Sequence, residues 1–151
     1  MRTLTPTTAE REFLATCEAA PLPEITGPIL AQVLRLPVLP GEDIVTILGA
    51  AHGLLSEAGV IRSRRTPPPA GGIEPFDAIR EAVTGRMQVD EAADWRLEDA
   101  AEIALDAAVA DLGQPGEDFG DYVRRIDVSD ADVLRAFVTA GRIALEYGGE
   151  S

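Results

Sequence analysis

Apolar residues recur every three or four positions in several segments of this chain, and prolines or glycines stop each segment. This period is typical of amphipathic helices that turn one apolar stripe towards a core. Because aromatic residues are only 5% of the chain, the core is expected to consist of alanine, leucine, isoleucine and valine, which suits close helix packing. We therefore predict an all-α single domain of five to seven helices, with at most one short pair of strands near Val60 and Ile61.

The stop signals set the bounds of the expected helices. Pro21 ends the first helix, Pro37 ends the second, and Gly59 follows the third. Thr7 and Glu10 have the spacing of a capping box at the start of the first helix. The expected helices are Thr8–Ala20, a short one between Thr26 and Leu36, Glu42–Ala58, Pro75–Thr84, Trp95–Leu112 and Asp130–Tyr147, with Asp118–Ile126 as a candidate for one more.

The apolar stripes also identify the side chains that should form the core. Gly49 and Gly53 are four residues apart and share one face, which favours close contact with another helix. Trp95 opens a helix and is expected in the core, with its indole N–H at the edge. The residues expected to be largely buried are Leu48, Leu55, Ile79, Leu97, Phe137 and Val138.

Turn-rich segments divide the chain into two parts. Residues 1–41 are expected to form an N-terminal helical extension packed on the body, and residues 42–151 the helical domain. Within the second part, Arg62–Gly72 contains three consecutive prolines and then two glycines. Such a sequence favours extended, solvated backbone, so we expect a mobile loop there.

The formal net charge of −13 limits the classes of partner. Such a chain repels the phosphates of nucleic acids and of anionic membranes, so we expect neither as a direct partner. Polar residues follow Met1–Leu4, and no apolar run approaches the ~20 residues that span a bilayer. A cytoplasmic protein is therefore the expectation.

Cys17 and His52 are the only cysteine and the only histidine of the sequence, which limits the disulfide, metal and catalytic sites that it could form. One cysteine cannot form an intramolecular disulfide, and one of each cannot provide four zinc ligands. Ser56 lies one helical turn from His52, but no glycine elbow or oxyanion loop accompanies the pair. We expect a small apolar role for Cys17, a partly buried structural role for His52, and neither a cofactor nor a metal.

Four carboxylates recur every four residues along the helix expected from Trp95 to Leu112, and they form one acidic ridge. Like charges at this spacing repel by about 0.2–0.5 kcal/mol per pair in an isolated helix. The repulsion could be offset by an internal arginine such as Arg80 or Arg124, by a partner's basic patch, or by two metal ions. Helical two-metal sites use a Glu-x-x-His spacing that His52 does not provide. The candidate partner-binding residues are Asp94, Glu98, Glu102 and Asp106.

Arg62, Arg64 and Arg65 form the one basic cluster of the sequence, directly before the prolines. Arginine binds phosphate and carboxylate groups with two parallel hydrogen bonds, so this cluster is a candidate anion-binding site. The alternatives are a solvated loop and pairing with the acidic ridge.

The order of segments from Glu42 to Tyr147 resembles a family of small helical proteins of actinobacteria and their phages, domain of unknown function 6197. The corresponding segments are Asp43–Glu57, Gly72–Ile79, Ile126–Ser129 and Val133–Leu134. The family's Trp-Asn-Asp motif is replaced by Arg125-Ile126-Asp127. The resemblance implies a helical fold and brings no catalytic residues.

These observations favour a non-enzymatic acidic interaction or regulatory protein. It is expected to bind a partner protein with a basic surface, in a sharper version by mimicking the charge of a nucleic acid. The alternative is a small-ligand-binding protein or enzyme with its site near Arg62–Arg65.

Overall fold

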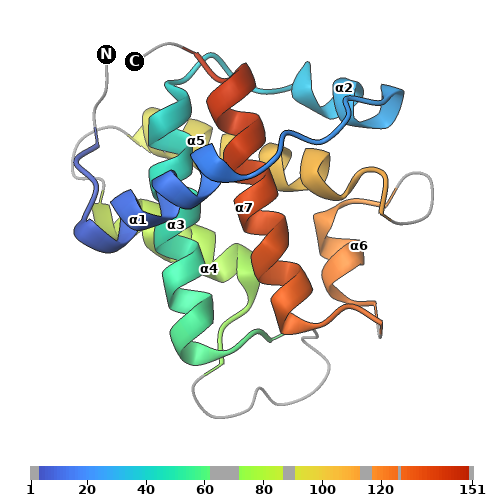
Figure 1. The fold of residues 1–151 in the computed structure, drawn as a ribbon. Helices are drawn as coiled ribbons and strands as arrows, with labels where there is room; N and C mark the ends of the chain where they lie inside the picture. The colour runs from blue at the N-terminus through green and yellow to red at the C-terminus, as the bar shows by residue number, and fades with distance from the viewer. Residues whose placement is uncertain (1–3, 62–71, 87–90, 113–116, 126, 150–151) are drawn as a thin grey trace.

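The computed structural model describes residues 4–61, 72–86, 91–112, 117–125 and 127–149, apart from the side chains of 86 and 91–94. Within these ranges the chain forms helices without any strand, and two isolated parallel bridges join Pro40 to Gly149 and Val60 to Ile73. The predicted all-α fold is confirmed (Figure 1). The helices are α1 (Thr8–Ala19), α2 (Gly27–Val33), α3 (Gly41–Ala58), α4 (Pro75–Arg86), α5 (Glu91–Val109), α6 (Phe119–Val123) and α7 (Asp130–Tyr147).

Local sequence signals set most of the helix starts. The predicted capping box of α1 is present, because Thr7 and Glu10 each accept a hydrogen bond from the backbone N–H of the other. The same reciprocal arrangement opens α6 at Asp118–Asp121 and α7 at Ser129–Asp132. Each box satisfies two backbone donors that a helix start leaves without partners.

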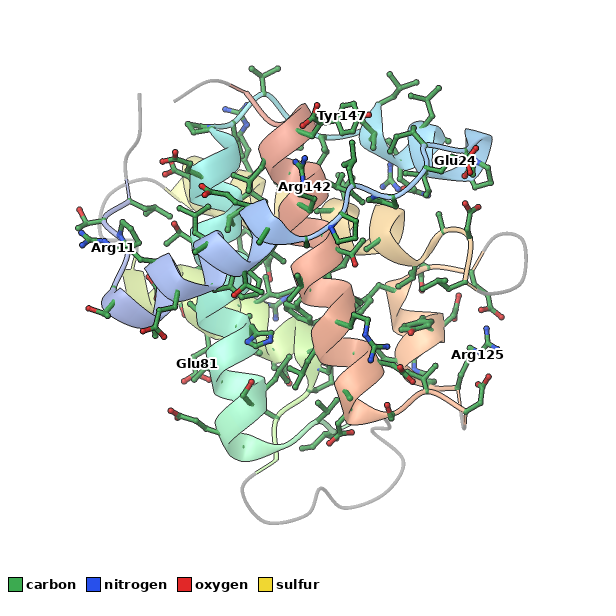
Figure 2. The ribbon with its side chains drawn as sticks, viewed as in Figure 1. Arg11, Glu24, Glu81, Arg125, Arg142 and Tyr147 are labelled. Carbon is green, nitrogen blue, oxygen red and sulfur yellow. The ribbon has the colours of Figure 1, made fainter. Side chains whose placement is uncertain are left out.

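Helices α3 and α7 lie side by side in the middle of the molecule, and α1 crosses both of them (Figure 1). Helices α4 and α5 pack on α3 from the other side, while α2 and α6 pack on α5. Figure 2 shows Arg142 pointing from α7 towards the end of α1, where its Nε donates to the carbonyl oxygen of Ala20 at 3.2 Å. A cation is favourable at this position because the last carbonyls of a helix carry partial negative charge.

Small residues allow the central helices to approach closely. A Cβ atom added at Gly41 would lie 2.5 Å from the carbonyl oxygen of Ala144, so α3 begins directly against the backbone of α7. A Cβ at Gly141 would overlap the sulfur of Cys17. The predicted close contact of Gly49 with another helix is confirmed, since a Cβ there would lie 3.0 Å from the Phe13 ring. The same prediction for Gly53 is wrong, because a Cβ there would have no atom within 4 Å.

Aromatic rings fill the other end of the core. Phe119 contacts Phe76 and Phe137 edge to face, with 5.8 Å between ring centroids in both pairs. Five of the six side chains predicted to be buried are buried, and Val138 is only partly buried because it lies at the edge of the inward face of α7.

The prediction for Trp95 is wrong, because its side chain is 56% exposed. Helix α5 begins at Glu91, four residues before the predicted start, so Trp95 lies in the second turn. The inward face of that helix is taken by Leu97, Ala101 and Ala104.

No helix in the described part of the chain is long and apolar enough to cross a membrane.

A matched pair of substitutions tests the packing of α3. Gly53→Ala should stabilise the protein by about 1 kcal/mol, because alanine favours a helix and the added methyl meets open space. Gly49→Ala should gain less than this or lose stability, because its methyl presses on Phe13. Chemical denaturation measures both, and equal gains would contradict the packing of α1 on α3.

Replacing Phe137 tests the aromatic end of the core. Phe137→Ala should lower the free energy of unfolding by about 3–5 kcal/mol, because the ring is fully buried against Phe119. Val138→Ala is the neighbouring control and should cost less, because Val138 is partly exposed. A loss below about 1 kcal/mol for Phe137→Ala would contradict the described core.

Candidate functional site

The acidic ridge of α5 is divided between the interior and the surface. Glu98 is only 4% exposed, and its Oε1 lies 3.1 Å from the Nε of Arg80 on α4. The hydrogen bond and the charge of Glu98 raise the pKa of Arg80 above its ordinary value. Of the alternatives for offsetting the repulsion, an internal arginine is therefore confirmed for Glu98, which cannot meet a partner directly.

Asp106, the last residue of the ridge, also has a structural role. Its Oδ1 accepts a hydrogen bond of 2.9 Å from the backbone N–H of Phe119, the first residue of α6. Burial raises the pKa of Asp106, while this hydrogen bond lowers it. The carboxylate therefore holds the start of α6 against α5, where an anion is favoured by the helix dipole.

Glu102 lies between these two carboxylates and is only partly buried. Burial, together with repulsion from Glu98, Asp99 and Asp106, raises its pKa from 4.5 to about 7. Arg80 opposes this shift only weakly, because its guanidinium is engaged with Glu98. Glu102 is therefore the ridge carboxyl whose charge is least compensated within the described residues.

Arg80 also contacts the exposed tryptophan of α5. Its guanidinium carbon lies 6.0 Å from the centroid of the Trp95 ring, within the range of a cation–π interaction. Asp99, one turn from Trp95, is exposed, and so is Asp77 on α4. The sequence interpretation missed this surface, although Trp95, Asp99 and Glu102 have the spacing of residues that share one side of a helix.

Other predicted site residues do not join this surface. The side chain of Asp94 and all of Arg62, Arg64 and Arg65 lie outside the described residues. Arg124, the second candidate for an internal partner, is exposed and forms no ion pair with the ridge in the part of the chain that is described.

A hollow of about 350 Å³ lies between the ends of α5, α6 and α7. Its lining includes the apolar residues Ala108, Leu112 and Val128 and two arginines. Arg125 binds both carboxylate oxygens of Asp127, at 2.9 and 3.1 Å, and Arg135 lies 2.8 Å from Asp132. Since each cation already has a carboxylate, this hollow offers little attraction for an anionic ligand.

His52 and Cys17 have the structural roles expected of them. The His52 ring packs on Phe13 with 5.0 Å between centroids, and burial lowers its pKa. The Ser56 hydroxyl donates to the backbone carbonyl of His52 rather than to its ring. Burial raises the pKa of the Cys17 thiol to about 12, which suppresses the reactive thiolate.

Comparisons with protein-family models, with curated proteins and with solved structures found no match for this chain. The likeness to domain of unknown function 6197 therefore stays a hypothesis. Among the described residues no group of three or more His, Cys, Asp or Glu side chains is placed to hold a metal ion.

Replacing Glu102 tests the uncompensated charge. Its folded-state pKa of about 7 lies above the ordinary 4.5, so the folded protein binds an extra proton between these values, and stability falls as pH rises through them. Glu102→Gln removes this loss. At pH about 8 the variant should be more stable by roughly 1–2 kcal/mol, after discounting for the partial exposure of the group.

The stability gain should shrink as pH falls from about 7 and vanish below about 4.5, where the wild-type carboxyl is protonated in both states. Urea denaturation across this pH range measures it. Glu12→Gln removes the same charge at an exposed position of α1, where a substitution should change the free energy of unfolding by less than about 0.5 kcal/mol. A pH-independent gain for Glu102→Gln would contradict the raised pKa.

Proposed function

We propose that this protein is a non-enzymatic interaction protein that binds the basic surface of a partner protein. The contact surface would be the exposed side of α4 and α5, here called the Trp95 face. It consists of Asp77, Arg80, Trp95, Asp99 and Glu102. The observation that carries the proposal is an exposed tryptophan, held by an arginine, among carboxylates on packed helices.

The composition of the Trp95 face supports a role in recognition. Tryptophan and arginine are the residues most often responsible for affinity at protein interfaces. Here Trp95 presents a large apolar surface to solvent, and the contact with Arg80 limits the positions that its ring can take. Because Arg80 is itself bonded to buried Glu98, the anchor is partly ordered before any partner arrives, which lowers the entropy cost of binding.

The charges of the Trp95 face favour a basic partner. Asp77 and Asp99 are exposed and Glu102 is partly exposed, whereas the one cation, Arg80, is already neutralised by Glu98. The negative field of such carboxylates speeds the approach of a cationic surface. A nucleic-acid-binding protein is one class of partner with such a surface, which corresponds to the charge-mimicry version of the hypothesis.

Glu102 gives this proposal a pH dependence. Its raised pKa of about 7 means that a substantial fraction of the group is protonated at neutral pH. A cation from the partner would stabilise the charged form and release that proton. Binding should therefore strengthen as pH rises from about 6 to about 8, by linkage between proton release and association.

The test is capture of the partner by the immobilised full chain from extracts of the native host, followed by mass spectrometry. Trp95→Ala and the double variant Asp99→Asn with Glu102→Gln should each lose the captured protein. Glu12→Gln with Glu18→Gln removes two exposed charges on α1 and should retain it. Binding should also weaken with added salt, since screening acts over about 8–10 Å.

Two outcomes would contradict the proposal. The first is retention of the same partner by Trp95→Ala and by the double variant while both remain folded. The second is a partner that the α1 control loses and the Trp95 variants keep, because the acidic contact would then lie on another face.

A further inference from the structure

The hollow between the ends of α5, α6 and α7 has the size of a small-molecule site. Its volume of about 350 Å³ lies within the range of about 300–1,000 Å³ that is typical of such sites. Sites of this kind combine apolar walls with a few polar groups that orient the ligand. The apolar part of the lining consists of Ala108, Leu112, Val128 and Ala136. Its polar groups therefore decide which class of ligand fits.

Two hydroxyl groups line the hollow without a partner in the described chain. They belong to Tyr122 and Thr139, and neither forms a hydrogen bond with another described residue. Thr46 and Thr84 differ, because their hydroxyls donate to the carbonyl oxygen one helical turn earlier. A tyrosine as buried as Tyr122, which is 8% exposed, usually finds a partner for its O–H. Tyr122 therefore has a donor that a ligand could use.

The charges of two ion pairs act on the Tyr122 hydroxyl. Burial and the charge of Asp132 raise the pKa of Tyr122, while Arg135 and Arg125 lower it and Asp127 raises it. All four charged residues line the hollow, so the hydroxyl faces it. Because the pKa is raised above its ordinary value, the hydroxyl keeps its proton at neutral pH and acts as a hydrogen-bond donor.

Arg125 is fully engaged within the protein. It binds both oxygens of Asp127, donates to the carbonyl oxygen of Leu112 at 3.0 Å and lies 3.9 Å from Glu117. Figure 2 shows Arg125 at the outer edge of the molecule, beside α6. These contacts fix one wall of the hollow before a ligand enters, which lowers the entropy cost of binding.

The balance of charge disfavours an ionised ligand. The carboxylates near the hollow are those of Asp127, Asp132 and Glu117, and they outnumber the guanidinium groups of Arg125 and Arg135. An anion is therefore repelled, and a cation must compete with arginines that already pair with the carboxylates. An uncharged ligand avoids both costs and the cost of burying a charge beside the apolar lining.

We propose that this hollow binds an uncharged small molecule with an apolar body and a carbonyl group, whose oxygen accepts a hydrogen bond from the Tyr122 hydroxyl. Ketones, esters and amides belong to this class, since a carbonyl oxygen accepts hydrogen bonds without carrying a full charge. The apolar body would contact Ala108, Val128 and Ala136. The site is independent of the Trp95 face, because no residue of that face lines the hollow.

Nuclear magnetic resonance of the full chain, titrated with the uncharged ketone acetophenone, tests the proposal. The backbone amides of Tyr122, Val128 and Ala136 should shift saturably, with a dissociation constant at or below about 10 mM for so small a molecule. Benzoate carries a carboxylate on the same ring and should bind at least about tenfold more weakly. No saturable shift at these residues, or equal binding of benzoate, overturns the proposal.

Tyr122→Phe tests the hydrogen bond, because it removes the hydroxyl and keeps the ring. It should weaken acetophenone binding about three- to tenfold and leave ethylbenzene, which lacks the carbonyl oxygen, unaffected. No described residue bonds to this hydroxyl, so folding should survive, as circular dichroism would verify. Unchanged acetophenone affinity, or an equal loss for ethylbenzene, overturns the role of Tyr122.

Filling the hollow tests its location. Ala136→Leu and Thr139→Leu each add bulk to its lining and should weaken acetophenone binding at least about tenfold, because the new side chain takes the place of the ligand. Ala15→Leu makes the first of these changes at an exposed position of α1, away from α6 in Figure 1, and should leave binding intact. Two variants are used so that one can replace the other if it fails to fold. A folded filling variant that binds acetophenone as the wild type does overturns the assignment.

Discussion

The close approach of α3 and α7 is the constraint on which the rest of the structure depends. Glycines stand where the two backbones meet, and a side chain at Gly41 or Gly148 would overlap the other helix. With the two helices this close, α1 can lie across both, placing Phe13 on Gly49 and Cys17 on Gly141. The opposite side of the pair then receives α5. A core with few aromatics is thus dense because its backbones are near.

Periodicity and stop signals were enough to predict the helices, because they depend on interactions within a few residues. Thr7, Ser129 and the glycines after the long helices act on their own turns of backbone, so their effects can be read from sequence. The role of Gly141 could not be predicted, because it depends on Cys17, a residue that is remote in the chain. Gly53 looked equivalent to Gly49 for the same reason, and only the position of α1 distinguishes them.

The candidate site shows the same division between local and remote interactions. The carboxylate repeat of α5 was visible in the sequence, and so was the need for something to offset its repulsion. The repulsion is offset differently at each carboxylate. Arg80 of α4 pairs with Glu98, and the backbone N–H at the start of α6 donates to Asp106. Glu102 has neither, and burial together with the remaining repulsion from its neighbours raises its pKa. The prediction that Trp95 lies in the core was wrong, because α5 begins four residues earlier than expected, and this changes which side chains reach the core.

The proposed contact of the Trp95 face would relieve a repulsion within the protein itself. The charged form of Glu102 is opposed by burial and by repulsion from Glu98, Asp99 and Asp106. A cation from a basic partner would oppose that repulsion, so association and loss of the proton from Glu102 would favour one another. Salt weakens the attraction to the partner, because it screens exposed charges over about 8–10 Å. Ionic strength and pH would thus act on the same carboxylates, with low salt and higher pH favouring the bound protein.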